Sequence, residues 1–315
     1  MQQIPVTDTD LVVSELCYGG VSWGVRVTDA EMDQLVGLFR DLGGNFFDTA
    51  HCYSHWLPGG ASGSSERALA GYFKRSGGRD EAIVATKGGM ASANGYRRLS
   101  GRYLSAERIG ADIDDSLGRL ETDVIDLYWL HCDDPAVGVE EIIDFLNVEV
   151  SRGRIRYLGA SNWSAARMDA ANRYAARRNL RGFVASQPQW TLAQPTAGLH
   201  APIPGFFSDE DFAAHAVSGI PVVPHTPTAH GYFADNVDLE DSDFDNEVSL
   251  KRKKRARQLG ADLGRPATQI ALAYLTASPF PVVPILGTLN PDHLRDADAS
   301  LEVDLTLEER AKLAS

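Results

Sequence analysis

Short apolar runs alternate with longer amphipathic segments along almost the whole chain, which is typical of strands that alternate with helices. The first pair shows the pattern, because apolar residues 16–19 precede helical spacing over residues 29–42, and Gly43 and Gly44 then end that helix. The runs that predict strands are residues 16–19, 45–47, 82–85, 124–130, 156–159, 183–186, 221–224 and 281–285. The segments that predict helices are residues 29–42, the stretch from Ser64, 106–120, 139–151, 165–178, 209–217, 247–259, 267–277, the stretch from Pro291 and a short one from Leu305.

Eight strand–helix units in succession, without consecutive strands in the body of the chain, predict a parallel sheet. Eight repeats predict its closure into an α/β fold of the TIM type, a (β/α)8 barrel. Residues 1–13 are expected to form a β-hairpin at the bottom of the barrel. The rival fold, an open doubly wound sheet, normally carries Gly-x-Gly-x-x-Gly after its first strand, and no such match follows an early strand here. We therefore expect a single barrel domain over residues 1–315.

The composition fits such a domain, because 43% of the 315 residues are hydrophobic and 23% are charged. Three scattered cysteines favour a reducing compartment over a disulfide framework. The N-terminus lacks a basic region followed by an apolar core, and no apolar run approaches the ~20 residues of a membrane helix. These features predict a cytoplasmic protein that does not insert into membranes.

The formal net charge of −13 makes nucleic acid an unlikely partner, because a phosphate backbone would be repelled. One basic run opposes this trend at residues 251–257, and we interpret it as a solvated helix face. The sequence does not indicate an oligomeric state.

In a barrel of this type, functional residues gather where the strands end. Polar side chains occupy most of these ends, whereas the strand interiors are apolar. The strand-end residues are Asp48, Lys87, His131, Ser161, Asn162, Gln187, His225, Thr226 and Thr288, and Tyr53 follows Asp48 on its loop. Packing alone would not require this distribution, so the strand ends are the candidate site.

Four of these residues suit the reduction of a carbonyl group. Lys87 and Asp48, on adjacent strands, are expected to form an ion pair, and a lysine ammonium near Tyr53 would lower the pKa of the phenol. Tyr53 would then donate a proton to a carbonyl oxygen that His131 orients. Singly, an Asp–Lys pair is more often structural, and a tyrosine or histidine more often packs. The grouping of four at consecutive strand ends favours the catalytic interpretation, provided that a hydride donor lies alongside.

A cluster of histidine and cysteine residues and a set of aromatic residues are two further candidates for ligand sites. His51, Cys52 and His55 lack a recognised metal-ligand spacing, so we expect no metal. Aromatic residues that core packing explains equally well as an aromatic substrate pocket are Trp23, Trp56, Trp163, Trp190, Phe206 and Phe207.

Several separated motifs, which together cover nearly the whole chain, resemble the aldo-keto reductase family. These motifs are residues 45–50 with Tyr53, residues 65–69, residues 116–120 followed by 123–131, and residues 153–162. The resemblance implies a NAD(P)H-dependent oxidoreductase on a (β/α)8 barrel, which acts on a small-molecule carbonyl or alcohol substrate. It also implies that Asp48, Tyr53, Lys87 and His131 form the catalytic tetrad.

The same resemblance implies the residues that hold the cofactor. Gly19, Gly20 and Val21 would lie beside the nicotinamide, together with Asp48, and the carboxamide would be held by Ser161, Asn162 and Gln187. His225 stands where the family usually stacks a tyrosine on the nicotinamide. The pyrophosphate would be wrapped by the segment that contains Thr226, Pro227, Thr228 and Gly231, and the adenosine end would be bound by Gly287, Thr288, His293 and Asp296.

Two departures from the family pattern leave the coenzyme open. An imidazole at His225 stacks with less area than a phenol, and Gly287, Leu289 and His293 provide no permanent positive charge for a 2′-phosphate. NADP(H) is the family default, and NAD(H) stays as the alternative. A second hypothesis for function is a cofactor-binding sensor or regulatory subunit with incidental turnover, because the family is similar in fold to ion-channel accessory subunits. The intact tetrad favours the enzyme.

Overall fold

The computed structural model of the chain describes residues 1–90, 102–196, 206–235 and 242–315. Seven strands form one parallel sheet in the spatial order β8-β7-β6-β5-β4-β3-β9. Their bounds are β3 (Cys17–Gly19), β4 (Phe46–Asp48), β5 (Ile83–Gly88), β6 (Ile125–Leu130), β7 (Ile155–Ser161), β8 (Phe183–Gln187) and β9 (Ile285–Leu286). From β3 to β8, successive strands of the chain are neighbours in space, so all their carboxyl ends meet at one end of the sheet.

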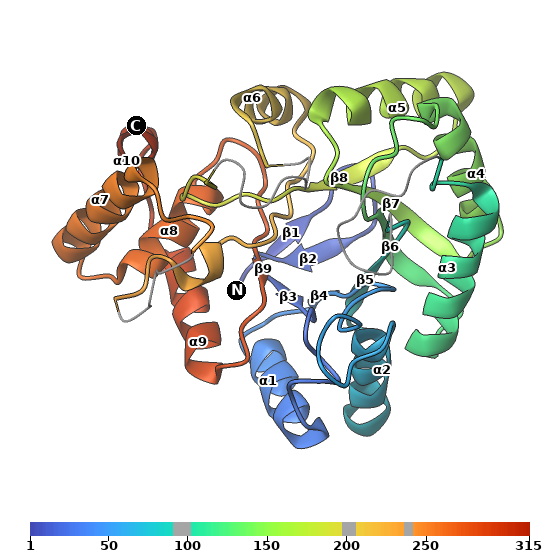
Figure 1. Cartoon of the computed structure of the whole chain (residues 1–315), viewed down its shortest axis with the longest axis horizontal. Helices are drawn as coiled ribbons and strands as arrows, with labels where there is room; N and C mark the ends of the chain where they lie inside the picture. Colours follow the sequence, from blue (N-terminus) through green and yellow to red (C-terminus); the bar gives the residue numbers. More distant parts are fainter. Residues whose placement is uncertain (91–101, 197–205, 236–241) are drawn as a thin grey trace.

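Helices follow the strands and surround the curled sheet (Figure 1). They are α1 (Asp29–Asp41), α2 (Ser64–Ser76), α3 (Ala106–Leu120), α4 (Val139–Ser151), α5 (Ala165–Arg178), α6 (Asp209–Ser218), η1 (Ala229–Gly231), α7 (Glu247–Leu263), α8 (Ala267–Thr276), α9 (Pro291–Ala299), η2 (Ser300–Glu302) and α10 (Leu307–Ala314). The parallel strand order and the helices between the strands agree with the predicted (β/α)8 barrel. In the described part of the chain, no helix is long and apolar enough to cross a membrane.

The seam that closes the barrel differs from the two uniform strands expected at residues 221–224 and 281–285. Only the two-residue β9 and isolated bridges from Val222 to Ser186 and to Val282 form there. The physical reason is a set of prolines, which have no N–H to donate to a ladder: Pro221, Pro224, Pro281 and Pro284. Their carbonyls still accept, as when Val222 N donates to Pro281 O at 2.9 Å and Ile285 N donates to Pro224 O at 2.9 Å.

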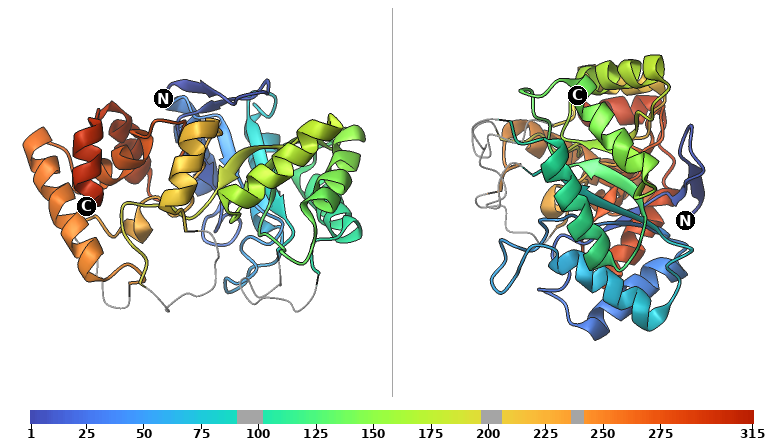
Figure 2. Two further views of the ribbon diagram at one scale, coloured as in Figure 1. Left: turned by 90° about the horizontal axis from the view of Figure 1, so that it is seen from above. Right: turned by 90° about the vertical axis from the view of Figure 1, so that its right-hand side faces the viewer.

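The expected N-terminal hairpin is confirmed. β1 (Gln3–Pro5) pairs antiparallel with β2 (Val12–Ser14), and the hairpin lies across one end of the sheet (Figure 2). Its connection buries Val6 and Leu11 in one cluster with the side chains that face the inside of the barrel. Those inward-facing residues are Cys17, Phe46, Ala85, Leu127, Trp129, Tyr157, Ala185, Val223, Val283 and Ile285. The hairpin therefore covers the end of the barrel that is opposite the strand ends with polar residues.

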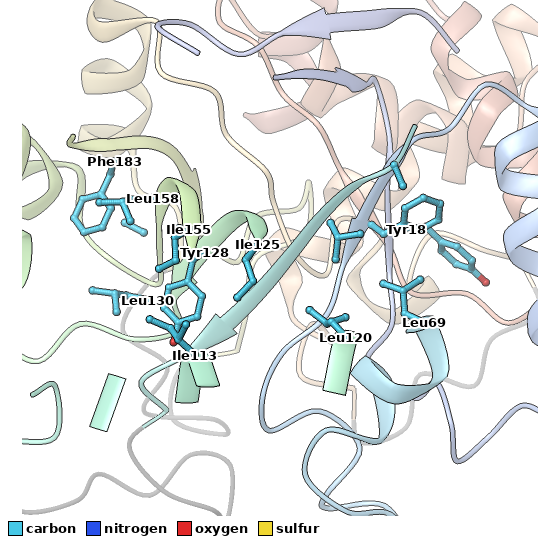
Figure 3. Close-up of a cluster of buried hydrophobic side chains, with 14 of the residues drawn as sticks. Tyr18, Leu69, Ile113, Leu120, Ile125, Tyr128, Leu130, Ile155, Leu158 and Phe183 are labelled. Carbon is cyan, nitrogen blue, oxygen red and sulfur yellow. The ribbon is translucent and has the colours of Figure 1, made fainter. Parts of the chain in front are cut away.

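A second apolar layer lies between the strands and the helices. Figure 3 shows part of it, where Tyr128 and Leu130 of β6 lie with Leu158 of β7 and Ile113 of α3. Inside the barrel, Gly159 makes room for an indole, since a Cβ there would come within 2.2 Å of the ring of Trp129. The filled interior holds the strand ends in fixed positions.

The basic run at residues 251–257 is only partly the solvated face that the sequence predicted. Lys253 is buried, and its ammonium donates to Ala234 O at 3.1 Å and lies over the ring of Tyr232. Arg252 donates to Leu192 O at 3.0 Å. These two cations fasten α7 to the segments that precede it, so part of the run has a structural role.

Candidate active site

The strand ends open into a cavity of about 540 Å³. Most of the residues that the sequence predicted for the site line it: Gly19, Val21, Asp48, Tyr53, His131, Ser161, Asn162, Gln187, His225, Thr226, Thr228, Gly231, Gly287, Thr288 and His293. Trp56, His230, Ala234 and Ile285 line it as well. Side chains from strands on all sides of the sheet thus meet in one place.

Lys87 is the centre of the group formed by Asp48, Tyr53, Lys87 and His131, which is called the catalytic corner after the role that the sequence predicts for it. Its side chain is 1% exposed, at the end of β5, behind the residues that line the cavity. The ammonium donates to the carboxylate of Asp48, to Thr49 O at 3.0 Å and to the Tyr53 hydroxyl at 2.8 Å. Because an ammonium has three protons to donate, these contacts use all of them and fix its position.

Asp48 is the anchor for this lysine. Its side chain is also 1% exposed, and the oxygen that does not face Lys87 accepts from Gln187 Nε2 at 3.1 Å. Burial raises the pKa of the Asp48 carboxyl, while the Lys87 ammonium and the Gln187 amide act in the opposite direction. A carboxylate that is desolvated in this way depends on its partners, so Asp48, Lys87 and Gln187 hold one another in place.

His131, directly after β6, lies edge-on to Tyr53 with 5.9 Å between the ring centroids. Burial lowers the pKa of His131 well below its usual range, and the Lys87 ammonium acts in the same direction. The imidazole is therefore neutral at pH 7. Its Nδ1 lies 3.6 Å from the Sγ of Cys52.

A second group of polar residues meets at the ends of β7 and β8. Ser161 Oγ donates to Gln187 O at 3.0 Å, and the Asn162 amide donates to His131 O at 2.9 Å. Asn162 has a left-handed φ of 57°, which directs its side chain into the cavity. Its Oδ1 lies 3.1 Å from His225 Nε2. Burial, the Lys87 ammonium and His230 lower the pKa of His225 to about 3, so this imidazole is neutral as well.

The loop from Thr226 to Gly231 has an unusual backbone. Left-handed φ angles occur at Thr226 (58°), Ala229 (49°), His230 (55°) and Gly231 (87°). Within the loop, Ala229 N donates to Thr226 O and Gly231 N donates to Thr228 O, both at 3.0 Å. Thr226, Thr228, His230 and Gly231 line the cavity.

The far end of the cavity is formed by Gly287, Thr288 and His293, and Thr288 Oγ1 lies 3.3 Å from His293 Nδ1. A Cβ on Gly287 would meet nothing within 4 Å, so the space beside it is open. Among the described residues that line the cavity, none is lysine or arginine.

Four predicted site residues do not line the cavity. Lys87 lies behind Tyr53, and Pro227 is buried in its loop. Gly20 packs against Trp23, whose ring would lie 2.2 Å from an added Cβ. The Asp296 carboxylate turns toward α8, where it accepts from Gln269 and Thr268 at 2.6 and 3.2 Å, so its assignment to the adenosine end stays a prediction.

Sequence reasoning missed Ala234 and Ile285, since small or apolar lining residues carry no chemical signal. His230 lay inside the predicted pyrophosphate segment without being singled out. Of the aromatic candidates, Trp56 lines the cavity and is 41% exposed, whereas Trp23, Trp163, Trp190 and Phe207 belong to the packed core. Within the described ranges, no three His, Cys, Asp or Glu side chains are placed to hold a metal ion.

Together, the fold and the cavity identify the class of protein. It is a (β/α)8 barrel with a polar cavity at the carboxyl ends of its strands. The sequence pattern of the Aldo/keto reductase family matches residues 15–315, and the chain belongs to that family. The protein is therefore an oxidoreductase of the aldo-keto reductase kind, a family that in general acts on carbonyl compounds with a nicotinamide cofactor.

Relatives extend over nearly the whole chain. An aryl-alcohol dehydrogenase of Pestalotiopsis microspora is 30% identical, with 94% of this chain and 77% of that protein covered. Norsolorinic acid reductase B of Aspergillus parasiticus is also 30% identical, with 94% and 79% covered. The uncharacterized oxidoreductase YrpG of Bacillus subtilis is 30% identical, with 95% and 91% covered. Among solved structures, a thermostable aldo-keto reductase in complex with the inhibitor epalrestat matches with a TM-score of 0.74 at 21% identity, over 100% of this chain and 99% of that one.

Proposed function

We propose that the protein reduces an aldehyde or ketone to the alcohol, and catalyses the reverse reaction, with NAD(P)H as hydride donor and Tyr53 as general acid and base. One observation carries the proposal. A single buried ammonium, Lys87 Nζ, contacts the Asp48 carboxylate, Thr49 O and the Tyr53 hydroxyl at once. A structural ion pair would not require the third contact, which is to a residue that faces the cavity.

The role of Tyr53 follows from this contact. When the phenol gives its proton to the carbonyl oxygen, the negative charge that remains on its oxygen lies 2.8 Å from the Lys87 ammonium and is stabilised there. A nicotinamide cofactor, when bound, would supply the hydride that the carbonyl carbon takes up. The phenolate then recovers a proton from solvent, and the reverse reaction uses the phenolate as the base.

His131 provides the second contact to the substrate oxygen. Because its imidazole is neutral, it keeps a nitrogen–hydrogen bond to donate without adding a charge to the corner. The substrate carbonyl would therefore lie between Tyr53 and His131, whose rings face each other edge-on.

The residues along the cavity fit the cofactor in kind. Amide and hydroxyl groups of Ser161, Asn162 and Gln187 match a carboxamide, which both donates and accepts. The left-handed loop at 226–231 suits a pyrophosphate, and Gly287, Thr288 and His293 would hold the adenosine end. NADP(H) is the family default. However, the lining offers a 2′-phosphate no permanent cation, so we propose that the enzyme accepts NADH as well.

We further propose an aryl carbonyl compound as the substrate class. Trp56 lies on the cavity wall with its ring edge-on to Tyr53 at 6.1 Å, and Val21 lines the same side. An aromatic wall next to the proton donor favours a flat, apolar substrate body. The name of one relative, an aryl-alcohol dehydrogenase, agrees with this class.

The test follows the absorbance of NADPH and of NADH with a panel of aryl, sugar and aliphatic carbonyl compounds. We expect turnover that is fastest on aryl aldehydes, and a loss of roughly 10²–10⁴-fold in kcat for Tyr53→Phe with cofactor affinity retained. Tyr174→Phe is the control, because that hydroxyl bonds to Asp144 on the surface. Equal turnover by Tyr53→Phe would disprove the role of Tyr53. Cofactor binding without turnover of any carbonyl would favour the sensor hypothesis instead.

A further inference from the structure

Cys52 is the immediate neighbour of Tyr53 in sequence but does not line the cavity. Its side chain turns inward, and Sγ lies 3.6 Å from Nδ1 of His131. Both residues are buried, with Cys52 4% and His131 7% exposed. The imidazole therefore has a thiol at Nδ1, which leaves Nε2 as the ring nitrogen that can serve the cavity that His131 lines.

The chemistry of the two groups decides which atom donates. Burial raises the pKa of the Cys52 thiol to about 12, so the sulfur keeps its proton at neutral pH. A thiol is a weak donor and a weaker acceptor, whereas an unprotonated imidazole nitrogen is a good acceptor. The favoured arrangement is thus Cys52 S–H donating to Nδ1, with the single proton of the neutral ring on Nε2.

We propose that Cys52 is a positioning residue that holds His131 as the Nε2–H tautomer. This inference rests on the proposed function, in which His131 donates to the carbonyl oxygen. The opposite tautomer would present a lone pair to that oxygen and repel it. The thiol thus selects the form of the ring that is able to stabilise the developing negative charge.

Other contacts around His131 do not make this selection. The Asn162 amide donates to the backbone carbonyl of His131, which orients the residue without contacting the ring. The neighbouring Cys132 directs its thiol to Met90 Sδ at 3.8 Å. Cys132→Ala is therefore a matched control, because it removes a half-buried thiol next to His131 without removing the partner of Nδ1.

The first measurement is ¹⁵N NMR of the histidine ring nitrogens in the free enzyme, with the His131 signals assigned by comparison with His131→Gln. We expect the Nε2–H form in the parent, in Cys132→Ala and in Cys52→Ser, whose hydroxyl also donates. Cys52→Ala is expected to show the Nδ1–H form alongside it. Nδ1–H as the main form in the parent would overturn the inference, and so would an unchanged tautomer in Cys52→Ala.

The second measurement is turnover. For Cys52→Ala we expect a fall of roughly fivefold in kcat, the equivalent of one hydrogen bond, with KM for the cofactor unchanged. Cys52→Ser is expected to keep kcat within about twofold, so that packing alone is excluded as the cause. A kcat that stays at the parent value in Cys52→Ala would overturn the proposed role. The NMR measurement needs no substrate, so it tests the tautomer even if the protein does not reduce carbonyl compounds. Failure of the proposed function and failure of this inference can therefore be distinguished.

Discussion

The catalytic corner and the adenosine end of the cavity are held by different means. At the corner, Lys87 and Asp48 are almost fully buried, and their side chains contact each other, Tyr53, Gln187 and the backbone carbonyl of Thr49. At the proposed adenosine end, Thr288 Oγ1 lies 3.3 Å from His293 Nδ1 and accepts from Asn290 N at 3.1 Å, while the nearby Asp296 bonds to α8. The corner is a buried network of polar groups, whereas Gly287 and His293 at the other end are exposed.

This difference explains where each region tolerates change. Removal of one partner from a buried network leaves a desolvated group without compensation, which is costly. The end of the cavity at Gly287 is open, and its described lining residues include no cation. A substitution there should cost little stability, but such a lining also discriminates weakly between ligands. We expect mutations at the corner to affect stability and rate together, and mutations at the adenosine end to affect coenzyme choice alone.

The largest effect is expected for Lys87→Met. The Asp48 carboxylate then stays buried without its counter-ion, so the free energy of unfolding should fall by about 3–5 kcal/mol in urea denaturation. Turnover should fall by roughly 10³-fold or more, because the Tyr53 phenolate loses its cation. The double variant Lys87→Met/Asp48→Asn should recover most of the stability and none of the activity. If the double variant did not recover stability, the unpaired Asp48 carboxylate would not be the cause of the lost stability.

A pH series measures the second effect, at His225. Burial holds its pKa at about 3, below the ordinary value, so the folded state resists protonation and the unfolded chain does not. The free energy of unfolding is therefore unaffected by this group above pH 6.5, and it decreases as the pH falls from 6.5 toward 3. In His225→Gln the slope of unfolding free energy over this window should decrease by up to about 1.4 kcal/mol per pH unit. The slope that remains should come from His131 and His215, because burial lowers their pKa values as well. An unchanged slope would contradict the assignment to His225.

A smaller effect is expected when a cation is added at the adenosine end. In His293→Arg, a guanidinium near the 2′-phosphate should raise the affinity for NADPH over NADH by about tenfold, the worth of one charge-assisted hydrogen bond. Fluorescence titration of both coenzymes gives the ratio. Gln258→Arg adds the same charge on the exposed face of α7 and should leave the ratio unchanged. An equal shift in both variants would show that net charge, and not the position of the arginine, is responsible.

The smallest effect is expected for Asp296→Asn. Loss of the carboxylate weakens two contacts between α9 and α8, so stability should fall by about 1 kcal/mol while cofactor affinity stays within about twofold. A tenfold loss of affinity with unchanged stability would instead support the role at the adenosine end that the family resemblance implies.

The sequence predicted the barrel, the hairpin and the catalytic corner because each of them has a local signal. Asp48, Lys87 and His131 each follow an apolar run, and a closed parallel sheet brings such positions to one end. Once these three residues are placed together, a role for the nearby Tyr53 hydroxyl can be predicted as well.

Features that depend on contacts between distant helices could not be read in this way. Asp296 turns away from the cavity because Gln269 and Thr268, on another helix, offer donors. Lys253 is buried because the carbonyl of Ala234 lies beneath α7. Neither periodicity nor composition encodes those partners, and the contact of Cys52 with His131 is hidden for the same reason.

The prolines at the seam have a consequence for strand registration. Since their nitrogens cannot donate, a slip of one residue in either segment would place Pro221, Pro224, Pro281 or Pro284 opposite a carbonyl and forfeit hydrogen bonds. The alignment of the closing segments with β8 and β3 is therefore locked against sliding. Gln187, at the end of β8, donates to Asp48, and Asp48 accepts from Lys87, so the strand that pairs with the closing segment also carries a contact to the buried ion pair.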